Sequence, residues 1–296
     1  MAPRTALLGV LIVVAVAVAA FALAEEKAEV VNGPATPAQS DGEWSTPVPG
    51  RAAVVWAVGD ADPPRSGRVA RLIRRADPDR ILYLGDVYPT GTPADFDRWA
   101  RPWGRLVRRM APTPGNHEWP QAEVGYEPFW QEVTGETPPA RYSFRAAGWE
   151  ILSLNSEEPD LDAAEAWLRE RTRGRGDCRI AFWHRPRYTA GKYRNFPVPE
   201  SATRYWDALE GRARIVLNGH DHNLQRMRRR DGIVEFVVGA GGRKLHPVDE
   251  RVRRLAFSDD RRYGALRLRL TPGRASWRFV AAGGTVLDSG SLRCHA

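Results

Sequence analysis

The segment Pro114-Gly115-Asn116-His117-Glu118 places an amide, an imidazole and a carboxylate directly behind a turn. Proline and glycine interrupt regular secondary structure, so we expect the three polar side chains to lie on a loop. Each of the three can bind a metal ion or take part in proton transfer. A polar turn without a function is the alternative for this segment taken alone, so the rest of the chain must decide between the two.

Other residues that can bind metals or move protons follow short apolar runs of the chain. The residues are Asp60, Asp86, His184, His220 and His222, and the runs before them are Ala52–Val58, Ile81–Leu84, Ile180–Trp183 and Ile215–Leu217. Such runs are typical of buried strands, and open α/β folds bind ligands at the carboxyl ends of their strands. If the strands share one edge, these side chains and Asn116 meet there. For each residue alone, a turn, a helix cap or a structural histidine is the alternative.

The residue types at this edge indicate a centre of two metal ions. Two cations held about 3.5–4 Å apart need a shared anion, and the carboxylate of Asp86 can supply it. Asp60 adds a second carboxylate, Asn116 adds a neutral oxygen, and the three histidines complete a mixed set of donors. This set suits Mn, Fe or Zn better than Ca or Mg, which prefer oxygen alone. Such ions activate water near neutral pH and also bind phosphate oxygens.

The elements that must position these residues alternate between short apolar runs and amphipathic stretches. Further strands are expected at Ile151–Leu154 and Val234–Val238 and, as a hairpin series, at Gly264–Leu270, Arg274–Val280 and Thr285–Ser289. Helices are expected at Ser66–Arg75, Ala94–Arg109, Leu161–Arg171 and around Tyr205–Leu209. This alternation predicts an α/β sandwich of mixed sheets covered by helices.

The N-terminal segment predicts the compartment of the protein. Arg4 precedes an uninterrupted apolar run, Ala6–Ala24, that ends in the cleavage-type sequence Ala22-Leu23-Ala24. We interpret residues 1–24 as a secretory signal peptide, with an uncleaved membrane anchor as the alternative, because the run is close to the length that spans a bilayer. Either way, the protein is expected to be secreted or otherwise outside the cytoplasm. Residues 25–50 are expected to form a disordered linker, and residues 51–296 one large domain.

The charge and the cysteines set further limits. The net charge is +8, yet only Lys27, Lys192 and Lys244 are lysines among 44 basic residues. Such a dominance of arginine indicates a compositional bias of the whole chain, so the charge does not by itself indicate a nucleic-acid partner. A basic surface that holds anionic polymers is the alternative. Cys178 and Cys294 either form a disulfide, which an oxidising compartment permits, or stay unpaired.

Together these segments resemble the calcineurin-like metallophosphoesterase superfamily. The shared motifs are Gly59-Asp60, Gly85-Asp86, Gly115–Glu118, the strand-end His184 and Gly219–His222, in the same order. The chain is more closely similar to the purple acid phosphatase branch, which carries a tyrosine after the second motif and a His-x-Pro stretch at the fourth, here His184-Arg185-Pro186. The resemblance covers roughly Ala52 to Ser289. It implies a four-layer α/β/β/α sandwich of two mixed sheets flanked by helices.

The resemblance also implies a role for each residue. The metal ligands would be Asp86 as the bridge, Asp60 and His222 on the first ion, and Asn116, His184 and His220 on the second. His117 would protonate the leaving oxygen as the general acid. The implied activity is hydrolysis of phosphate monoesters of small molecules by a metal-bridging hydroxide. A phosphodiesterase or nuclease of the same fold is the alternative enzyme, and a non-catalytic extracellular binding protein is a third interpretation.

Two positions depart from the pattern of the family. Purple acid phosphatases have a tyrosine three residues after the second-motif aspartate, where it binds a ferric ion, but here Pro89 holds that position and Tyr88 precedes it. Tyr88 is a candidate metal ligand if the loop is tighter. Many members have a histidine two residues after the first aspartate, where this chain has Asp62. We expect Asp62 to cap the turn, with metal binding as the alternative.

Some polar residues remain outside these assignments. His246 and His295 match no motif, and we expect both at the surface. Arg185 and Arg187 accompany the fourth motif, just after His184, where either could hold a phosphate oxygen or the leaving group, but in so arginine-rich a chain we expect them at the surface too.

Overall fold

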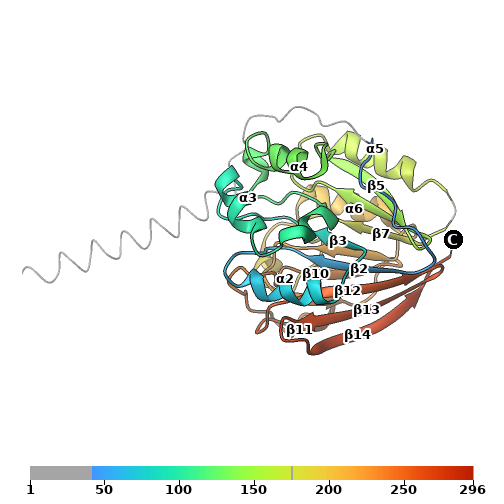
Figure 1. Cartoon of the computed structure of the whole chain (residues 1–296). Helices are drawn as coiled ribbons and strands as arrows, with labels where there is room; N and C mark the ends of the chain where they lie inside the picture. Colours follow the sequence, from blue (N-terminus) through green and yellow to red (C-terminus); the bar gives the residue numbers. More distant parts are fainter. Residues whose placement is uncertain (1–41, 175, 296) are drawn as a thin grey trace, which may run out of the picture. The chain divides into compact units, whose positions relative to one another are not determined.

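The computed structural model describes residues 42–174 and 176–295. These residues form two β-sheets, one of eight strands and one of six, with a core between them and helices on their outer faces (Figure 1). The predicted α/β class with two mixed sheets flanked by helices is confirmed. The expected signal peptide or anchor at 1–24, and the expected linker up to residue 41, lie outside the described residues. Within the described part of the chain, no helix is both long and apolar enough to cross a membrane.

Each sheet combines neighbouring parallel strands with antiparallel strands. The eight-stranded sheet has the order β1 (Gly42–Glu43), β5 (Arg141–Ala146), β6 (Trp149–Leu154), β7 (Arg179–Phe182), β8 (Ile215–Asn218), β10 (Val234–Val238), β9 (Leu224–Met227) and β11 (Leu255–Asp259). The six-stranded sheet has the order β14 (Val286–Arg293), β13 (Arg274–Ala281), β12 (Gly264–Thr271), β2 (Ala53–Val58), β3 (Arg80–Tyr83) and β4 (Met110–Pro112). Strands β6, β7, β8 and β10 run parallel, as do β2, β3 and β4. Parallel strands end on the same side, so their carboxyl ends lie together.

The helices cover the outer faces of the sheets. α2 (Ser66–Arg75), α3 (Pro93–Ala100) and α4 (Tyr126–Thr134) pack on the six-stranded sheet, and α5 (Leu161–Arg171) and α6 (Glu200–Leu209) pack on the eight-stranded sheet. Side chains alternate between the two sides of a strand. In β2, Val55 and Ala57 face the core between the sheets, whereas Trp56 and Val58 face the helices. Burial of these apolar layers holds the four-layer arrangement together.

The predicted helix Ala94–Arg109 is two shorter helices in the structure. α3 begins at Pro93, where the hydroxyl of Thr92 accepts the backbone N–H of Asp95 at 3.3 Å. A 3-10 helix, η1 (Gly104–Arg109), follows it. Between them lies Pro102, which has no N–H to donate, and η1 begins at Gly104, whose φ of 53° is outside the helical region. The prediction of one helix was wrong because the apolar spacing continues across both pieces.

Both ends of the described chain contact the eight-stranded sheet. Trp44, inside the segment expected to be a linker, is buried and packs against Tyr142 with ring centroids 5.0 Å apart. At the other end, Cys294 forms a disulfide with Cys178, which precedes β7. Of the two alternatives that the sequence left open, the structure has the disulfide. It joins the end of β14, the edge strand of the six-stranded sheet, to the other sheet.

Reduction of this disulfide should lower the stability of the protein. The bridge closes a loop between cysteines 116 residues apart, and a loop of this size restricts the unfolded chain strongly. We expect reduction to lower the free energy of unfolding by about 2–5 kcal/mol, measured as a lower denaturant midpoint. A Cys178→Ser/Cys294→Ser variant is the control, because reductant should leave its midpoint unchanged. An unchanged midpoint of the fully reduced wild-type chain would contradict the expectation.

Candidate metal centre

The carboxyl ends of strands from both sheets bring the six expected ligands to one place. From the six-stranded sheet come Asp60 after β2, Asp86 after β3 and Asn116 after β4. From the eight-stranded sheet come His184 after β7, and His220 and His222 after β8. The structure therefore brings together side chains that lie far apart in the sequence. Oxygen donors come from one sheet and imidazoles come from the other.

Tight turns after the strands direct these side chains toward one another. Asp60, Asp86 and His220 have φ angles of 57°, 72° and 66°, a conformation that costs energy in a non-glycine residue and that concentrates at functional sites. Glycines beside them permit a close approach of the backbone. A Cβ on Gly115 would lie 2.2 Å from Oδ1 of Asp86, and one on Gly219 would lie 2.7 Å from Oδ2 of Asp60. Only glycine leaves room for the carboxylates at these two positions.

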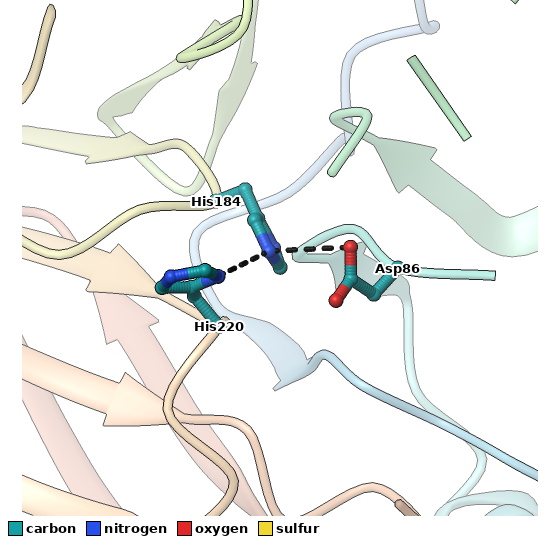
Figure 2. Close-up of side chains that lie close together, drawn as sticks. All are labelled: Asp86, His184 and His220. Atoms are coloured by element: carbon teal, nitrogen blue, oxygen red, sulfur yellow. Dashed lines mark hydrogen bonds and ion pairs between the residues drawn. The ribbon is translucent and has the colours of Figure 1, made fainter. Parts of the chain in front are cut away.

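One group of donors forms around His184, which is fully buried (Figure 2). Its Nε2 lies 3.3 Å from Oδ1 of Asp86, 3.2 Å from Nδ1 of His220 and 3.1 Å from Oδ1 of Asn116. Its Nδ1 lies 2.7 Å from the carbonyl oxygen of Leu84. A carbonyl can only accept, so in the neutral ring, the form that binds a metal, Nδ1 carries the hydrogen and Nε2 offers a lone pair. Acceptor atoms then face one another, an arrangement that a cation satisfies.

A second group forms around the hydroxyl of Tyr88, which is also buried. The hydroxyl oxygen lies 3.0 Å from Oδ1 of Asp60, 2.8 Å from Oδ2 of Asp86 and 2.9 Å from Nε2 of His222. One hydroxyl hydrogen can serve only one of these three acceptors. Tyr88 therefore does reach this part of the centre, although it stands one residue earlier than in the family pattern. Asp86 belongs to both groups: its ligand atom lies within 4.8 Å of those of His184 and His220 in the one, and of those of Asp60 and His222 in the other.

The charges of the centre favour bound cations. Burial raises the pKa of Asp60 well above its usual range, and the carboxylate of Asp86 raises it further. Burial lowers the pKa of His184, but the charge of Asp86 outweighs this effect and raises that pKa to about 10. Two buried carboxylates thus draw positive charge to the point where the donors converge. The donor types, their tautomers and their charge fit a pair of metal ions.

His117 lies at the mouth of the centre beside Tyr88, with ring centroids 4.4 Å apart. Its Nδ1 lies 2.5 Å from the carbonyl oxygen of Pro89, so Nδ1 carries a hydrogen and Nε2 is left without a partner from that carbonyl. Nε2 lies 3.9 Å from Oδ2 of Asp86, and 33% of the side chain is exposed. A proton on Nε2 is therefore within reach both of the shared carboxylate and of a group that enters from solvent.

Glu118 holds the loops of the second and third motifs together. Its Oε1 accepts the backbone N–H groups of Asp86 at 3.0 Å and Gly115 at 2.9 Å, and its Oε2 accepts that of Val87 at 2.9 Å. Burial, and after it the charge of Asp86, raises its pKa to about 7. Its side chain is fully occupied with backbone donors, so the structure gives it a positioning role that the sequence pattern did not reveal.

A loop that the sequence reasoning missed completes the centre. Residues 239–246 follow β10, and the carbonyl of Lys244 accepts Nδ1–H of His222 at 2.9 Å. His246 stacks on His222 with ring centroids 3.9 Å apart, and its Nδ1 lies 3.3 Å from Oδ1 of the buried Asp221. The expectation that His246 lies at the surface away from the motifs was wrong. The available signal was the run Gly239-Ala240-Gly241-Gly242 directly after a strand, which indicates close backbone approach.

Arg243 of the same loop covers Tyr88. Its guanidinium carbon lies 4.3 Å from the centre of the Tyr88 ring, and its Nη1 lies 3.2 Å from Oδ2 of Asp62. Asp62 is in neither donor group; its side chain pairs with Arg243 and its carbonyl accepts the N–H of Ser66 where α2 begins. The Arg243 side chain is 33% exposed. Two basic side chains, His117 and Arg243, thus flank Tyr88 at the mouth of the centre.

The carboxylates of Glu157 and Glu235 bind the loop that follows His184. Arg185, expected at the surface, is only 19% exposed and pairs with Glu157 at 2.9 Å. Glu235 of β10 is fully buried and accepts the backbone N–H groups of Arg187 at 2.8 Å and Tyr188 at 3.1 Å. Burial outweighs these hydrogen bonds and raises the pKa of Glu235 to about 8.

The fold and these motifs define a calcineurin-like phosphoesterase. The chain belongs to this family, because the family model of calcineurin-like phosphoesterases matches residues 54–224, more than half of the chain. The resemblance predicted from the motifs is thereby confirmed.

Particular relatives agree with this assignment. The fold is similar to that of a purple acid phosphatase from yellow lupin (Lupinus luteus) seeds, with a TM-score of 0.67 and 17% identity over 83% of this chain and 55% of that one. It is also similar to a dimetal phosphatase from Danio rerio, with a TM-score of 0.56 and 12% identity over 83% of this chain and 99% of that one. A probable cyclic nucleotide phosphodiesterase of Synechococcus sp. is 26% identical over 178 residues. That match covers 54% of this chain and spans only 64% of the relative's length.

The buried carboxyl group of Glu235 should make stability depend on pH. Its pKa of about 8 in the fold lies above the usual value of 4.5. The contribution of this group to the free energy of unfolding is therefore complete below about pH 4.5 and is lost as the pH rises through about 8. The Glu235→Gln variant keeps an acceptor for the backbone N–H groups but does not titrate. We expect its free energy of unfolding, relative to wild type, to rise between pH 5 and 8 by a few kcal/mol, on the order of 1.4 kcal/mol per pKa unit.

Urea unfolding at several pH values measures this difference. Glu165→Gln is the matched control, because hydrogen bonds from Arg204 and Arg169 lower the pKa of Glu165. The difference in free energy of unfolding between Glu165→Gln and wild type should stay constant over the same pH range. A constant difference for Glu235→Gln as well would show that the Glu235 carboxyl group does not hold a proton in the folded state.

Proposed function

We propose that the protein uses two metal ions to hydrolyse phosphate monoesters of small molecules. One observation carries the proposal: two groups of buried metal-binding side chains, around His184 and around Tyr88, share the single carboxylate of Asp86. Membership of a phosphoesterase family supports the reaction class. Fe, Mn or Zn suits the mixture of nitrogen and oxygen donors.

Each donor has a defined part in holding the ions. The proposed ligands are Asp86 as the bridge, Asp60, His222 and Tyr88 on the first ion, and Asn116, His184 and His220 on the second. When bound, the ions would polarise the phosphoryl group and acidify the attacking water. The carbonyls of Leu84 and Lys244 keep Nε2 of His184 and of His222 turned toward the centre. A fixed tautomer removes the need to reorganise when the substrate arrives.

His117 would act as the general acid. The Pro89 carbonyl orients its ring and leaves Nε2 free to donate a proton to the departing oxygen. An alkoxide leaves slowly unless it receives a proton as the P–O bond breaks. The partly exposed position of His117 at the mouth gives a leaving group access to Nε2.

The mouth of the centre suits a substrate with two negative charges. A phosphate monoester carries between one and a half and two negative charges at neutral pH, whereas a diester carries one. Arg243 is held by Asp62 and by the ring of Tyr88, so its guanidinium is oriented before a substrate arrives. It can then donate charge-assisted hydrogen bonds to a phosphoryl oxygen. This arrangement supports the preference for monoesters.

Hydrolysis of a phosphodiester is the second candidate. The Synechococcus relative bears the description of a probable cyclic nucleotide phosphodiesterase, and its similarity to this chain favours a comparison with diester substrates. The same two ions would serve either reaction. The two candidates differ in how much the basic side chains at the mouth contribute to the rate.

The proposed place of action is outside the cytoplasm. The apolar run Ala6–Ala24 supports export, and the disulfide between Cys178 and Cys294 supports an oxidising compartment.

Replacement of His117 should slow substrates with poor leaving groups selectively. We expect His117→Ala to lower kcat/KM for an alkyl phosphate by about 10²–10⁴-fold. The loss for nitrophenyl phosphate should be much smaller, because nitrophenolate leaves without a proton. Both rates are measured with the purified full chain in the presence of Mn²⁺ or Zn²⁺. Equal losses for both substrates would contradict the acid role.

The metal content of variants distinguishes the general acid, His117, from the metal ligands. Elemental analysis should find two metal ions per chain in wild type and in His117→Ala, but a loss of metal in Asp86→Ala. If iron is bound, a visible absorption band that disappears in Tyr88→Phe would establish the phenolate as a ligand. A wild-type chain that binds no metal and hydrolyses no phosphoester would refute the proposed function.

Replacement of Arg243 should slow the hydrolysis of phosphate monoesters more than that of diesters. Arg243→Met keeps an apolar contact with the Tyr88 ring but removes a cation worth about 1.5–3 kcal/mol to a bound anion. We expect kcat/KM for an aryl phosphate to fall by roughly 10–100-fold, and that for a bis-aryl phosphate to change much less. Arg254→Met is the matched control, since Arg254 lies at the same 4.3 Å over the ring of Tyr188. Equal losses for both substrates would favour the diesterase candidate.

A further inference from the structure

Among the described residues, no helix covers part of the outer face of the six-stranded sheet. In Figure 1, α2 lies in front of the sheet near β2 and β12, whereas β13 and β14 have no helix in front of them. The register pairs Arg267 of β12 with Trp56 of β2, so both side chains lie on the same face. Trp56 is buried under the helices, whereas Arg269 and Arg278 are exposed. The open face of β12–β14 is therefore a surface of the described domain.

Five arginines lie on this surface, which we call the arginine face: Arg267, Arg269, Arg274, Arg278 and Arg293. The register sets Arg267 directly opposite Arg278, and Arg274 directly opposite Arg293. Like charges in directly opposed positions destabilise a sheet. The sheet therefore contains two pairs of directly opposed arginines, and their repulsion lowers its stability.

No carboxylate of β12, β13 or β14 lies on the arginine face. The one acidic residue of these strands, Asp288, accepts hydrogen bonds from Arg226 at 2.9 Å and from the indole N–H of Trp277 at 3.0 Å, on the opposite side of the sheet. Burial lowers the pKa of Arg267, and the neighbouring charges of Arg278 and Arg269 lower it further. Elsewhere, exposed arginines such as Arg109 and Arg251 form ion pairs with aspartates. The positive charge of the arginine face is therefore left uncompensated by its own strands.

The arginine face is hollowed and continues toward α2. A depression of about 550 Å³ lies over the arginine face and also includes the hydroxyl groups of Ser276, Ser289 and Ser291. A second depression, of about 670 Å³, is lined by residues of the β13–β14 turn and by Arg68, Arg71 and Arg75 of α2. These three arginines recur at helical spacing, so they share one face of α2. Basic side chains thus line two depressions that both include residues of β13.

We propose that the arginine face binds a linear polymer of polyol phosphodiesters. A chain with regularly spaced negative charges matches arginines about 6.8 Å apart on β12 (Arg267 and Arg269) and about twice that distance apart on β13 (Arg274 and Arg278). A narrow polymer can enter the depressions, whereas the flat surface of a membrane contacts only their rims. The serine hydroxyls between the arginines can bond with the hydroxyl groups of a polyol.

Nucleic acid fits this surface less well. Proteins that bind single strands stack the bases on aromatic side chains. Trp277 and Phe279 of β13 belong to the core between the sheets, and each depression includes only one aromatic residue, Trp277 in the first and Tyr263 in the second. The recognition is therefore one of charge and hydroxyl groups, and it does not depend on the metal centre.

Binding of a fluorescent poly(glycerol phosphate) oligomer to the full chain tests the proposal. The variant Arg269→Ser/Arg278→Ser/Arg293→Ser removes three exposed charges from the arginine face. We expect it to lower the affinity at least tenfold and to reduce the slope of log K against log salt by about 2, since each neutralised charge contributes about 0.7. The control Arg51→Ser/Arg101→Ser/Arg105→Ser removes three exposed charges elsewhere and should stay within twofold of wild type.

Further measurements make the outcome decisive. The Arg269, Arg278 and Arg293 variant should melt no lower than wild type, because it relieves repulsion between opposed arginines, and it should hydrolyse a small aryl phosphate at the wild-type rate. Equal losses of affinity in both triple variants would show that only net charge matters and would overturn the proposal. Equal or tighter binding of an oligothymidylate of the same charge, or binding of anionic vesicles that depends on the same arginines, would also overturn it.

Discussion

Attraction between carboxylates of one sheet and imidazoles of the other, centred on Asp86, is the interaction on which the structure of the site depends. Asp60 and Asp86 leave the ends of β2 and β3, whereas His184 and His222 leave the ends of β7 and β8. The apolar core between the sheets sets their separation and lets these ends meet. Neither sheet alone carries a complete set of metal donors. The fold and the chemistry are therefore linked, because the packing that buries the core also assembles the centre.

A layer of buried acceptors around this centre keeps the donors in place. Glu118 and Glu235 bind backbone N–H groups of the loops that carry Asp86 and follow His184. Burial raises the pKa of both carboxyl groups, because a charged carboxylate loses its hydration inside the fold. Their contribution is geometric, because a loop fixed by several hydrogen bonds presents its ligand in one orientation.

Much of this site could be predicted from the sequence because its ligands obey a simple rule. Polar residues such as Asp86 and His184 directly follow apolar runs, and strand ends on one side of a sheet converge. The loop 239–246 did not follow that rule, because glycines dominate it and its contribution includes the backbone carbonyl of Lys244, which no side-chain pattern reveals. The path of the loop between Asp86 and Pro89 was also needed before Tyr88 could be placed.

Strand register accounts for the other differences between prediction and structure. The hairpin series after Gly264 was predicted, but the opposition of Arg267 and Arg278 follows only from the pairing of β12 with β13. Strands β5, β9 and β11 were not predicted, since polar residues such as Arg141, Gln225 and Ser258 interrupt their apolar pattern. Neighbouring strands and buried ion pairs, such as that of Arg141 with Glu158, compensate these polar groups in the fold. A single sequence does not reveal such tertiary compensation.

The disulfide between Cys178 and Cys294 joins the two sheets at the end opposite to the metal ligands, because Cys178 precedes β7 and His184 follows it. The sandwich is thus closed by a covalent link at one end and by metal coordination, where ions are bound, at the other. Chains made where thiols stay reduced would lack this covalent link. The C-terminal edge would then depend on the pairing of β14 with β13, the ion pair of Asp288 with Arg226 and the hydrogen bonds between Asp177 and His295. Recombinant protein from a reducing cytosol could fold around its ions and still differ at its C-terminal edge from protein made in an oxidising compartment.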